Sequence, residues 1–491
     1  MLLLSAHEKG KLPTLTTRRI GAVRVFERLW RETGCREVIE SLARERRFGF
    51  PVERAVFLTV LHRLLAPGSD RRAERWREDY AIEGTEGLGL HHLYRAMAWL
   101  GEPLAEQRGA SPLGPRCTKD RVEEALFSRR RDLLSELELV FLDTTSLYFE
   151  GEGGQSLGRR GHSKDHRPDL KQMVVGAVLD GEGRPVACEM WPGNTTDVKV
   201  LLPVAERLAE RFRVRRACLV ADRGMISART LGALEERGWP YILGARMRSQ
   251  KEVCEQVLSR AGRYRVVREG SGKPAPLKVK EVWVEGRRYI VCLNEAQARK
   301  DAAEREEIVQ ALREQLRAGA KSLVGNRGYR RYLKSTGEAF EIDQAKLKAE
   351  ARFDGKWVLR TNTELAPEEV ALRYKQLWQV EALFRSTKSL LQTRPIFHRC
   401  DETIRGHVFC SFLALVLRKA LLDRLEAAGA SHEWADVLRD LEALQEIDVL
   451  YEGKRFRLRT EARGACAPVF RAVGLALPPT VQRLPEVLQA S

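Results

Sequence analysis

Two aspartates stand where short apolar runs end. Asp143 follows Leu-Val-Phe-Leu, and Asp222 follows Cys-Leu-Val-Ala. Apolar runs of this length are typical of buried strands, and functional groups in α/β sheets gather at strand ends. Asp222 has a second reading as the cap of a helix after Gly224, whereas no helix follows Asp143. An ionised carboxylate at the end of a buried strand needs a partner, so both are candidates for catalysis or metal binding.

A third acid, Glu381, lies in the segment RYKQLWQVEALFRSTKSLLQTRP, residues 373–395. The pattern predicts an amphipathic helix that ends before Pro395. At about 100° per residue, one narrow face carries Tyr374, Leu377, Glu381, Phe384 and Lys388. We expect this face to be buried because three of its residues are apolar or aromatic. An unpaired carboxylate there would be costly, so Glu381 needs a cation, a metal or a proton.

Together the three acids could form an all-oxygen site. Hard oxygen ligands suit Mg²⁺ or Mn²⁺ rather than zinc. Two such ions about 4 Å apart can activate one oxygen and stabilise the departing one in phosphodiester displacement. Asp143, Asp222 and Glu381 are therefore predicted as catalytic residues and as metal ligands.

The order and surroundings of these acids resemble the DDE transposases of bacterial insertion sequences. Asp143 lies in FLDTTS and Asp222 in VADRGM, and Glu381 lies in a segment similar to the Tyr-x2-Arg-x3-Glu-x6-Lys signature of one large group. Tyr374 and Lys388 match that spacing, but Leu377 stands where the arginine belongs. The segments GHSKDHRPDLKQ, WPGNTTD, VLRTNT and RPIFHR…IRGHV also resemble the group. The resemblance covers roughly residues 137–425.

The resemblance implies a ribonuclease H-like core and DNA transposition. Such an enzyme binds terminal inverted repeats, hydrolyses a strand to free a 3′-OH and joins that hydroxyl to target DNA. It uses Mg²⁺ or Mn²⁺, which we expect as two ions, and double-stranded DNA of the element ends and the target. We also expect a homodimer in the DNA complex. Two alternatives remain: a ribonuclease H-like nuclease without strand transfer, and a catalytically idle DNA-binding relic, against which the intact acids argue.

Several further residues are predicted to contact DNA. Each also has an ordinary reading as a core residue, a solvated helix end or a solvated loop. Arg385 is the nearest replacement for the arginine missing at Leu377, and Arg373 and Lys375 are the other candidates. The full set of predicted DNA contacts is Tyr374, Lys388, Arg385, His162, Lys164, Arg167 and Trp283. Zinc binding by His162 and His166 is not favoured because no cysteine or histidine partner lies nearby in the sequence.

The elements that must position these residues form an α/β chain with a mixed, ribonuclease H-like sheet flanked by helices. Asp197 is expected to cap a helix that begins near it, and a late helix is expected over residues 433–447. We expect five parts: a helical DNA-binding domain (1–136), the first part of the catalytic core (137–245), an α+β insertion (246–355), the second part of the core with the glutamate helix (356–425), and a helical, basic extension (426–491).

Composition agrees with a polyanionic partner. The 491 residues carry 85 Lys and Arg against 68 Asp and Glu, a formal net charge of +17, which is a footprint of nucleic-acid binding. Nine cysteines are scattered singly without a C-x-x-C pair, which indicates a reduced compartment. We find no signal peptide and no apolar run long enough for a membrane span. The expected location is the bacterial cytoplasm, in association with the nucleoid.

Overall fold

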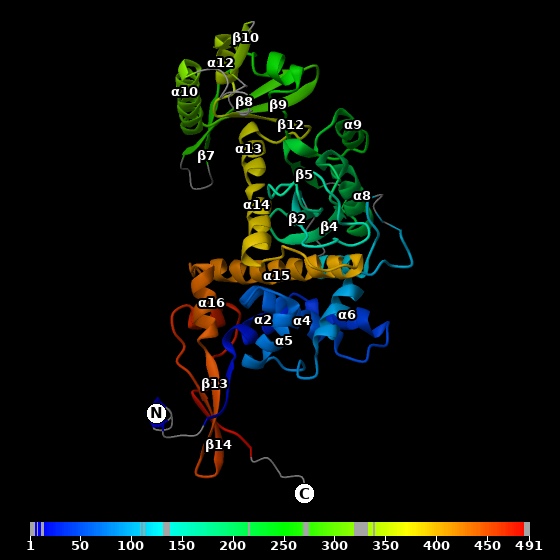
Figure 1. Cartoon of the computed structure of the whole chain (residues 1–491), viewed down its shortest axis with the longest axis vertical. Coiled ribbons are helices and arrows are strands. Elements are labelled where there is room, and N and C mark those ends of the chain that lie inside the picture. The colour runs from blue at the N-terminus through cyan, green and yellow to red at the C-terminus, as the bar shows by residue number, and fades with distance from the viewer. Residues whose placement is uncertain are drawn as a thin grey trace.

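The computed structural model describes residues 5–6, 8–10, 14–108, 110, 113–130, 138–214, 217–268, 274–318, 332–336 and 339–485. The predicted boundary at 136/137 lies outside these residues. Helices α2 to α6 lie on one side of the long helix α15 (Asp401–Ala427), and the large sheet lies on its other side (Figure 1). Within the described ranges, no helix combines the length and the apolar character that crossing a bilayer requires.

The N-terminal part is helical, as expected. Helix α4 is buried on every side, including its charged residues, because α2, α3, α5, α6 and α15 all pack around it. Helices α6 and α15 cross closely at Gly101 and Gly406, where a Cβ would collide with the carbonyl oxygens of Glu402 and Met97 respectively. The helices are α2 (Gly21–Glu32), α3 (Cys35–Arg44), α4 (Val52–Leu65), α5 (Asp70–Trp76), α6 (Leu90–Gly101) and α7 (Thr118–Arg130).

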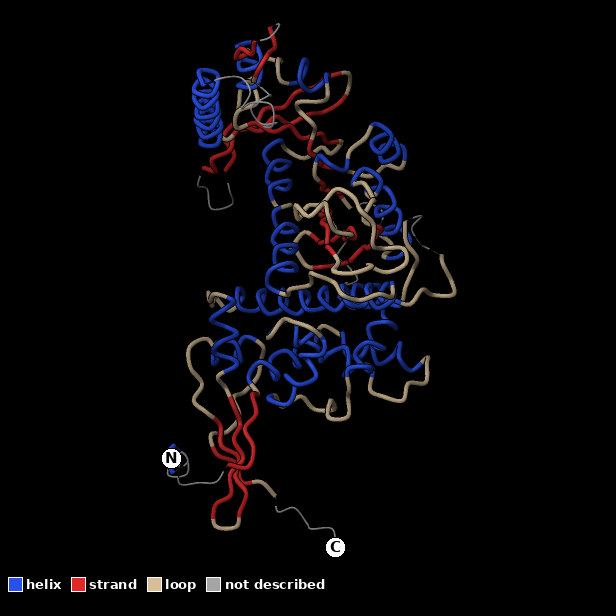
Figure 2. The backbone as a smooth tube through the Cα atoms, in the orientation of Figure 1, coloured by secondary structure: helices blue, strands red, loops and turns tan. Residues whose placement is uncertain are grey.

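Nine of the described strands form one mixed sheet, shown in red in the upper half of Figure 2. Strands β2, β5 and β6 are parallel to one another, and the other pairings are antiparallel. The order is β4 (Pro185–Pro192), β3 (Gln172–Asp180), β2 (Leu139–Tyr148), β5 (Cys218–Ala221), β6 (Tyr241–Gly244), β12 (Lys356–Thr361), β9 (Arg287–Leu293), β8 (Pro274–Val284) and β7 (Arg265–Arg268).

Helices cover both faces of this sheet. On one face, Val140, Leu142 and Leu219 share a core with α8 (Leu201–Arg211) and α9 (Ala228–Glu236). On the other face, Phe141 and Val220 share a core with α13 (Pro367–Lys375), α14 (Trp378–Arg385) and α15. Successive strand residues point to opposite faces, so this alternation decides which side chains of β2 and β5 face the glutamate helix. A mixed α/β sheet flanked by helices is confirmed.

Residues 246–355 extend the same sheet. They supply β7, β8 and β9, and β12 then returns between β6 and β9. Strands β8 and β9 form an antiparallel hairpin, and the long charged helix α10 (Glu295–Ala318) follows it. The remaining described elements of this segment are the π-helical turn η4 (Glu252–Val257), the hairpin β10 (Leu333–Thr336) and β11 (Ala339–Ile342), and α12 (Gln344–Ala351).

The two ends of the described chain meet in a second sheet, with the order β1 (Thr14–Arg19), β13 (Gln445–Tyr451), β14 (Lys454–Arg459) and β15 (Val481–Arg483). It extends away from the helices (Figure 2). The helix predicted over 433–447 is too long, because α16 (Trp434–Glu442) ends early and residues 445–447 pair with residues 17–19 of β1. This long-range pairing overrides the local helical pattern. Helix α17 (Cys466–Ala472) completes the chain's last part.

Candidate active site

Asp143 and Asp222 lie side by side. Strands β2 and β5 are parallel neighbours in register, with Leu142 opposite Ala221. Asp143 follows Leu142 and Asp222 follows Ala221, and neighbouring strands are about 4.8 Å apart. Asp143 lies two residues after Phe141, and Asp222 lies two residues after Val220. Both aspartates therefore lie on the face of the sheet that α13 and α14 cover.

Tyr374 of α13 reaches this pair. Its hydroxyl donates a hydrogen bond of 3.0 Å to Oδ1 of Asp222. The approach depends on Gly244 at the end of β6, because a Cβ there would lie 2.5 Å from the Tyr374 hydroxyl oxygen. Burial raises the pKa of Tyr374 well above its ordinary value, and the negative charge of Asp222 adds to the rise. Tyr374 therefore acts as a neutral donor that orients Asp222.

Asp143 is half-buried, and other acids lie near it. Burial raises its pKa to about 6, and the nearby Asp222 and Asp197 add to the rise. Lys164 and the backbone N–H of Thr144 oppose it, and that N–H lies 2.7 Å from Oδ1 of Asp143. A carboxyl group whose pKa is raised by neighbouring carboxylates is typical of sites that take up a cation.

Asp197 is a further carboxylate of this site, and its prediction as a helix cap is wrong. It begins the short turn η2 (Asp197–Lys199) and makes no capping hydrogen bond. Its Oδ1 accepts a 2.6 Å bond from the Thr144 hydroxyl, and its Oδ2 lies 3.2 Å from Nζ of Lys164. Lys164 also donates to the carbonyl oxygen and the hydroxyl of Thr144, both at 2.8 Å. The only hint in the sequence was its place at the end of WPGNTTD.

Glu381 is exposed, so the expectation that it lies on a buried face is wrong. The segment is not one regular helix: α13 ends at Lys375, α14 begins at Trp378, and a π-helical turn follows at Ser386–Leu390. These breaks change which residues share a face. Within α14 the buried residues are Val380 and Phe384, whereas Trp378, Glu381 and Arg385 form an exposed stripe.

The three predicted acids are not gathered around one point in this conformation. Among the described residues, the one group of three or more potential ligands whose donor atoms all lie within 4.8 Å of one another is Asp70, His398 and His407. Glu381 nevertheless belongs to the helix that packs on β2 and β3, over the aspartate pair. It has no hydrogen bond or ion pair to any described residue, so its carboxylate is available to a ligand.

Lys388 forms an ion pair with another residue of the same chain. Its Nζ lies 2.7 Å from Oδ1 of Asp165, in the basic loop that follows β2, and Arg394 lies 3.2 Å from the same oxygen. Burial lowers the pKa of Lys388, and Asp165 opposes this change. Two cations share one carboxylate, so the cluster keeps a net positive charge.

The other predicted DNA contacts lie on the surface. His162 and Arg385 are exposed, and Arg167 is exposed but paired with Asp169 at 2.8 Å. Trp283 on β8 is 56% exposed, which excludes an ordinary core role. Sequence reasoning missed Trp378, which is 59% exposed, one turn before Glu381 on the same stripe. Its signal was the spacing of three residues from Glu381.

Leu377 does not face a groove. Its side chain is 6% exposed and belongs to the core beneath α14. Its burial agrees with the buried face expected for Leu377, and the position where the resemblance places an arginine lies in the core here. A guanidinium at this position would have to leave the core.

Comparisons with known proteins identify the family of this chain. The model of the Transposase DDE domain family matches residues 135–417, more than half of the chain. A search of the solved structures returned the piggyBac transposase synaptic complex with hairpin DNA, at 9% identity and a TM-score of 0.41, covering 86% of this chain and 79% of that one. No curated protein matches the sequence. The family match spans β2, β5 and α14 with their three acids, and the chain belongs to the DDE transposase family.

Proposed function

We propose that this transposase binds the terminal inverted repeats of an insertion sequence, cleaves the DNA strand at each end and joins the freed 3′-OH to target DNA. The observation that carries the proposal is the aspartate pair on the parallel strands β2 and β5, with Asp143 in the middle of β2 and Asp222 directly after β5, on the sheet face that α13 and α14 cover. A ribonuclease H-like core is part of the proposal. Its support is the mixed sheet with an antiparallel meander, β2 to β4, followed by parallel β5 and β6.

The residues present fit a divalent metal. The donor set consists of carboxylate oxygens, which Mg²⁺ and Mn²⁺ prefer. Burial chiefly, and then Asp222 and Asp197, raise the pKa of Asp143, so a cation bound beside it would stabilise its ionised form. Asp143 and Asp222 already lie side by side, and Glu381 would have to move nearer to them to complete the site. The three acids would then hold the metal, which we propose as two ions. Such ions supply an activated attacking oxygen and stabilise the departing one.

The chain's own groups prepare this site. Tyr374 fixes one oxygen of Asp222 and leaves the other free. Lys164 and Thr144 hold Asp197 beside the pair, so a third negative charge stays close without touching Asp143. At neutral pH Asp143 is mostly ionised, because its pKa is about 6, and it can therefore act as a ligand rather than as an acid.

DNA would lie along the exposed edge of α14. The stripe of Trp378, Glu381 and Arg385 presents an aromatic ring, the third acid and a cation to the same side. Aromatic side chains stack on unpaired bases, and guanidinium groups bind phosphate. Tyr374, the loop with His162, Lys164 and Arg167, the Lys388 cluster and Trp283 would add contacts. The helical part up to residue 136 would bind the element ends, and a homodimer would bring two ends together.

Cleavage by variant enzymes tests the proposal. We expect Asp143→Asn, Asp222→Asn and Glu381→Gln each to reduce Mg²⁺-dependent cleavage of an end-bearing duplex by more than about 100-fold, beyond the 10–100-fold loss typical of residues that only support a ligand. Binding of the ends should persist in a gel-shift assay. Glu426→Gln, on the exposed end of α15, is the matched control. Near wild-type cleavage by Glu381→Gln would refute its role as the third acid.

A nuclease without strand transfer shares the same acids. Cleavage assays do not separate the two functions, because both begin with metal-dependent hydrolysis. Formation of a joined product from a pre-cleaved end distinguishes them.

A further inference from the structure

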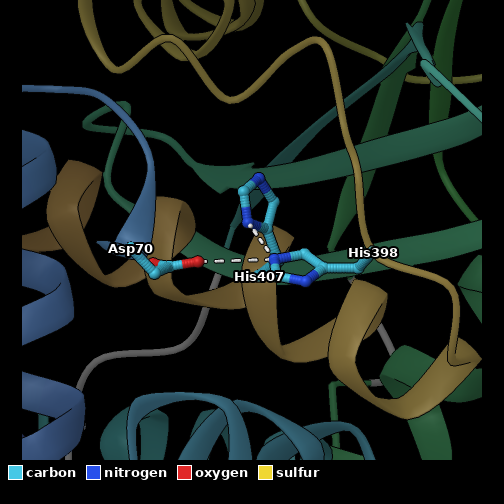
Figure 3. Close-up of side chains that lie close together, drawn as sticks. All are labelled: Asp70, His398 and His407. Carbon is cyan, nitrogen blue, oxygen red and sulfur yellow. Dashed lines mark hydrogen bonds and ion pairs between the residues drawn. The ribbon is translucent and has the colours of Figure 1, made fainter. Parts of the chain in front are cut away.

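A second cluster of potential metal ligands lies between the N-terminal helices and α15. Asp70 begins α5, His398 lies in the loop after the glutamate segment, and His407 lies in α15. Figure 3 shows the three side chains pointing toward one another. Nε2 of His398 lies 3.4 Å from Oδ2 of Asp70 and 3.1 Å from Nδ1 of His407. Asp70 therefore meets two histidines that lie more than 300 residues later in the chain and nine residues apart from each other.

The tautomer of His407 turns a lone pair toward this volume. Its Nε2 lies 3.1 Å from the carbonyl oxygen of Thr393, which can only accept a hydrogen bond. The proton of a neutral His407 ring is therefore on Nε2, and Nδ1 carries the lone pair that faces His398. A histidine held through its other nitrogen by a backbone carbonyl is the usual arrangement of a metal ligand.

Two of the three separations match a tetrahedral zinc shell. Zinc–ligand bonds of 2.0–2.1 Å place neighbouring ligand atoms about 3.3 Å apart in a tetrahedron. The two separations measured at Nε2 of His398, 3.1 and 3.4 Å, bracket this value. The ligand atoms of His407 and Asp70 lie within 4.8 Å of each other, and they would move closer together when an ion binds. Two imidazoles and one carboxylate suit Zn²⁺ and related transition ions, whereas Mg²⁺ prefers an all-oxygen shell.

The guanidinium of Arg63, on α4, already lies beside two of these ligands. Its Nη2 lies 2.9 Å from Nδ1 of His407 and 3.8 Å from Oδ1 of Asp70. Its Nη1 donates to the carbonyl oxygen of His407 and to the hydroxyl of Ser411, both at 2.6 Å. A guanidinium can only donate, so Nη2 points a hydrogen at the lone pair of Nδ1, and an incoming ion would have to displace Nη2 from His407. The contacts of Nη1 would keep Arg63 attached to α15 as Nη2 turns away.

We propose that Asp70, His398 and His407 bind a single Zn²⁺ ion that links the N-terminal helices to the loop at residue 398 and to α15. This site is separate from the aspartate pair and does not depend on the proposed function. Its fourth position is open to water. By joining α5, the loop at residue 398 and α15, the ion would stabilise the contact between the helical part and the catalytic sheet.

Zinc binding by the full chain tests this inference. The background is Asp143→Asn with Asp222→Asn, which removes the carboxylate pair from the measurement. After incubation with Zn²⁺ and desalting, we expect one retained zinc per chain by atomic emission. His398→Ala should lose it, and His398→Cys should keep it because a thiolate is also a zinc ligand. His432→Ala, an exposed histidine outside the cluster, should retain it.

The melting temperature separates a loss of zinc binding from misfolding of the variant. Zn²⁺ should raise the melting temperature of the background protein and of His398→Cys, but not that of His398→Ala. Equal zinc retention by the background protein and His398→Ala would overturn the proposal. So would a background protein that retains no zinc and shows no thermal shift.

Discussion

Asp143→Asn should stabilise the fold at neutral pH. The pKa of Asp143 rises from its ordinary value of 3.8 to about 6, chiefly because the side chain is buried. An acid whose pKa is raised in the folded state favours folding fully below its unfolded pKa. That contribution is lost as the pH rises through the folded pKa. Asparagine fills the same space without a charge and removes this pH dependence.

The size of the effect follows from the shift. About two pKa units at 1.36 kcal/mol each correspond to roughly 3 kcal/mol. The wild type should therefore lose about this much stability relative to Asp143→Asn between pH 3.8 and pH 7. Most of the change should fall between pH 4 and pH 6.

Urea unfolding of both proteins across this pH range, in the presence of a chelator, measures the difference. Comparing the two proteins at each pH cancels the titration of all other groups. Adding Mg²⁺ at pH 7 should stabilise the wild type more than the variant, because an ion that binds only the folded state adds stability. A stability difference that does not change with pH would refute the inferred environment of Asp143.

Two further predictions concern the helix over the aspartate pair. Tyr374→Phe removes a hydrogen bond to a charged group, worth about 1.5–3 kcal/mol, and should slow cleavage roughly 10–100-fold. Gly244→Ala should slow cleavage by a similar factor because it displaces the Tyr374 hydroxyl. The double variant should cleave no more slowly than either single variant, and additive losses in cleavage rate would contradict a shared cause. Arg385→Ala should weaken cleavage at saturating enzyme more than Arg373→Ala, because Arg385 lies on the exposed stripe with Glu381 whereas Arg373 is paired with Glu369 at 2.7 Å; equal rates for the two variants would count against this edge as the DNA side.

The aspartate pair was predictable because its signal is local. A carboxylate that interrupts an apolar run stands out in the sequence, as at Asp143 and Asp222. Their adjacency needs the parallel pairing of β2 with β5, which only the family resemblance suggested. The mixed sheet, the N-terminal helices and the return of the sheet at β12 were likewise visible in the hydrophobic pattern.

The predictions that were wrong concern residues whose local pattern does not determine their position in the fold. Asp197 satisfied the local rule for a helix cap, yet its partners Thr144 and Lys164 lie far away in the sequence. The face of Glu381 was derived from a continuous helix, and the interruption before Trp378 changed it. Residues 445–447 continue a helical pattern but pair with β1. His398 and His407 lie in the segment RPIFHR…IRGHV, but Asp70 joins them only through tertiary packing, so the sequence did not mark the three residues as one cluster.

Strand transfer tests the central claim most directly. A duplex that carries an element end with a free 3′-OH is incubated with the enzyme, Mg²⁺ and a supercoiled target plasmid. We predict a covalent product in which the 3′ end is joined to the plasmid, and its loss in Asp143→Asn and Glu381→Gln but not in Glu426→Gln. Metal-dependent nicking of DNA without any joined product would contradict a transposase and favour a hydrolytic nuclease.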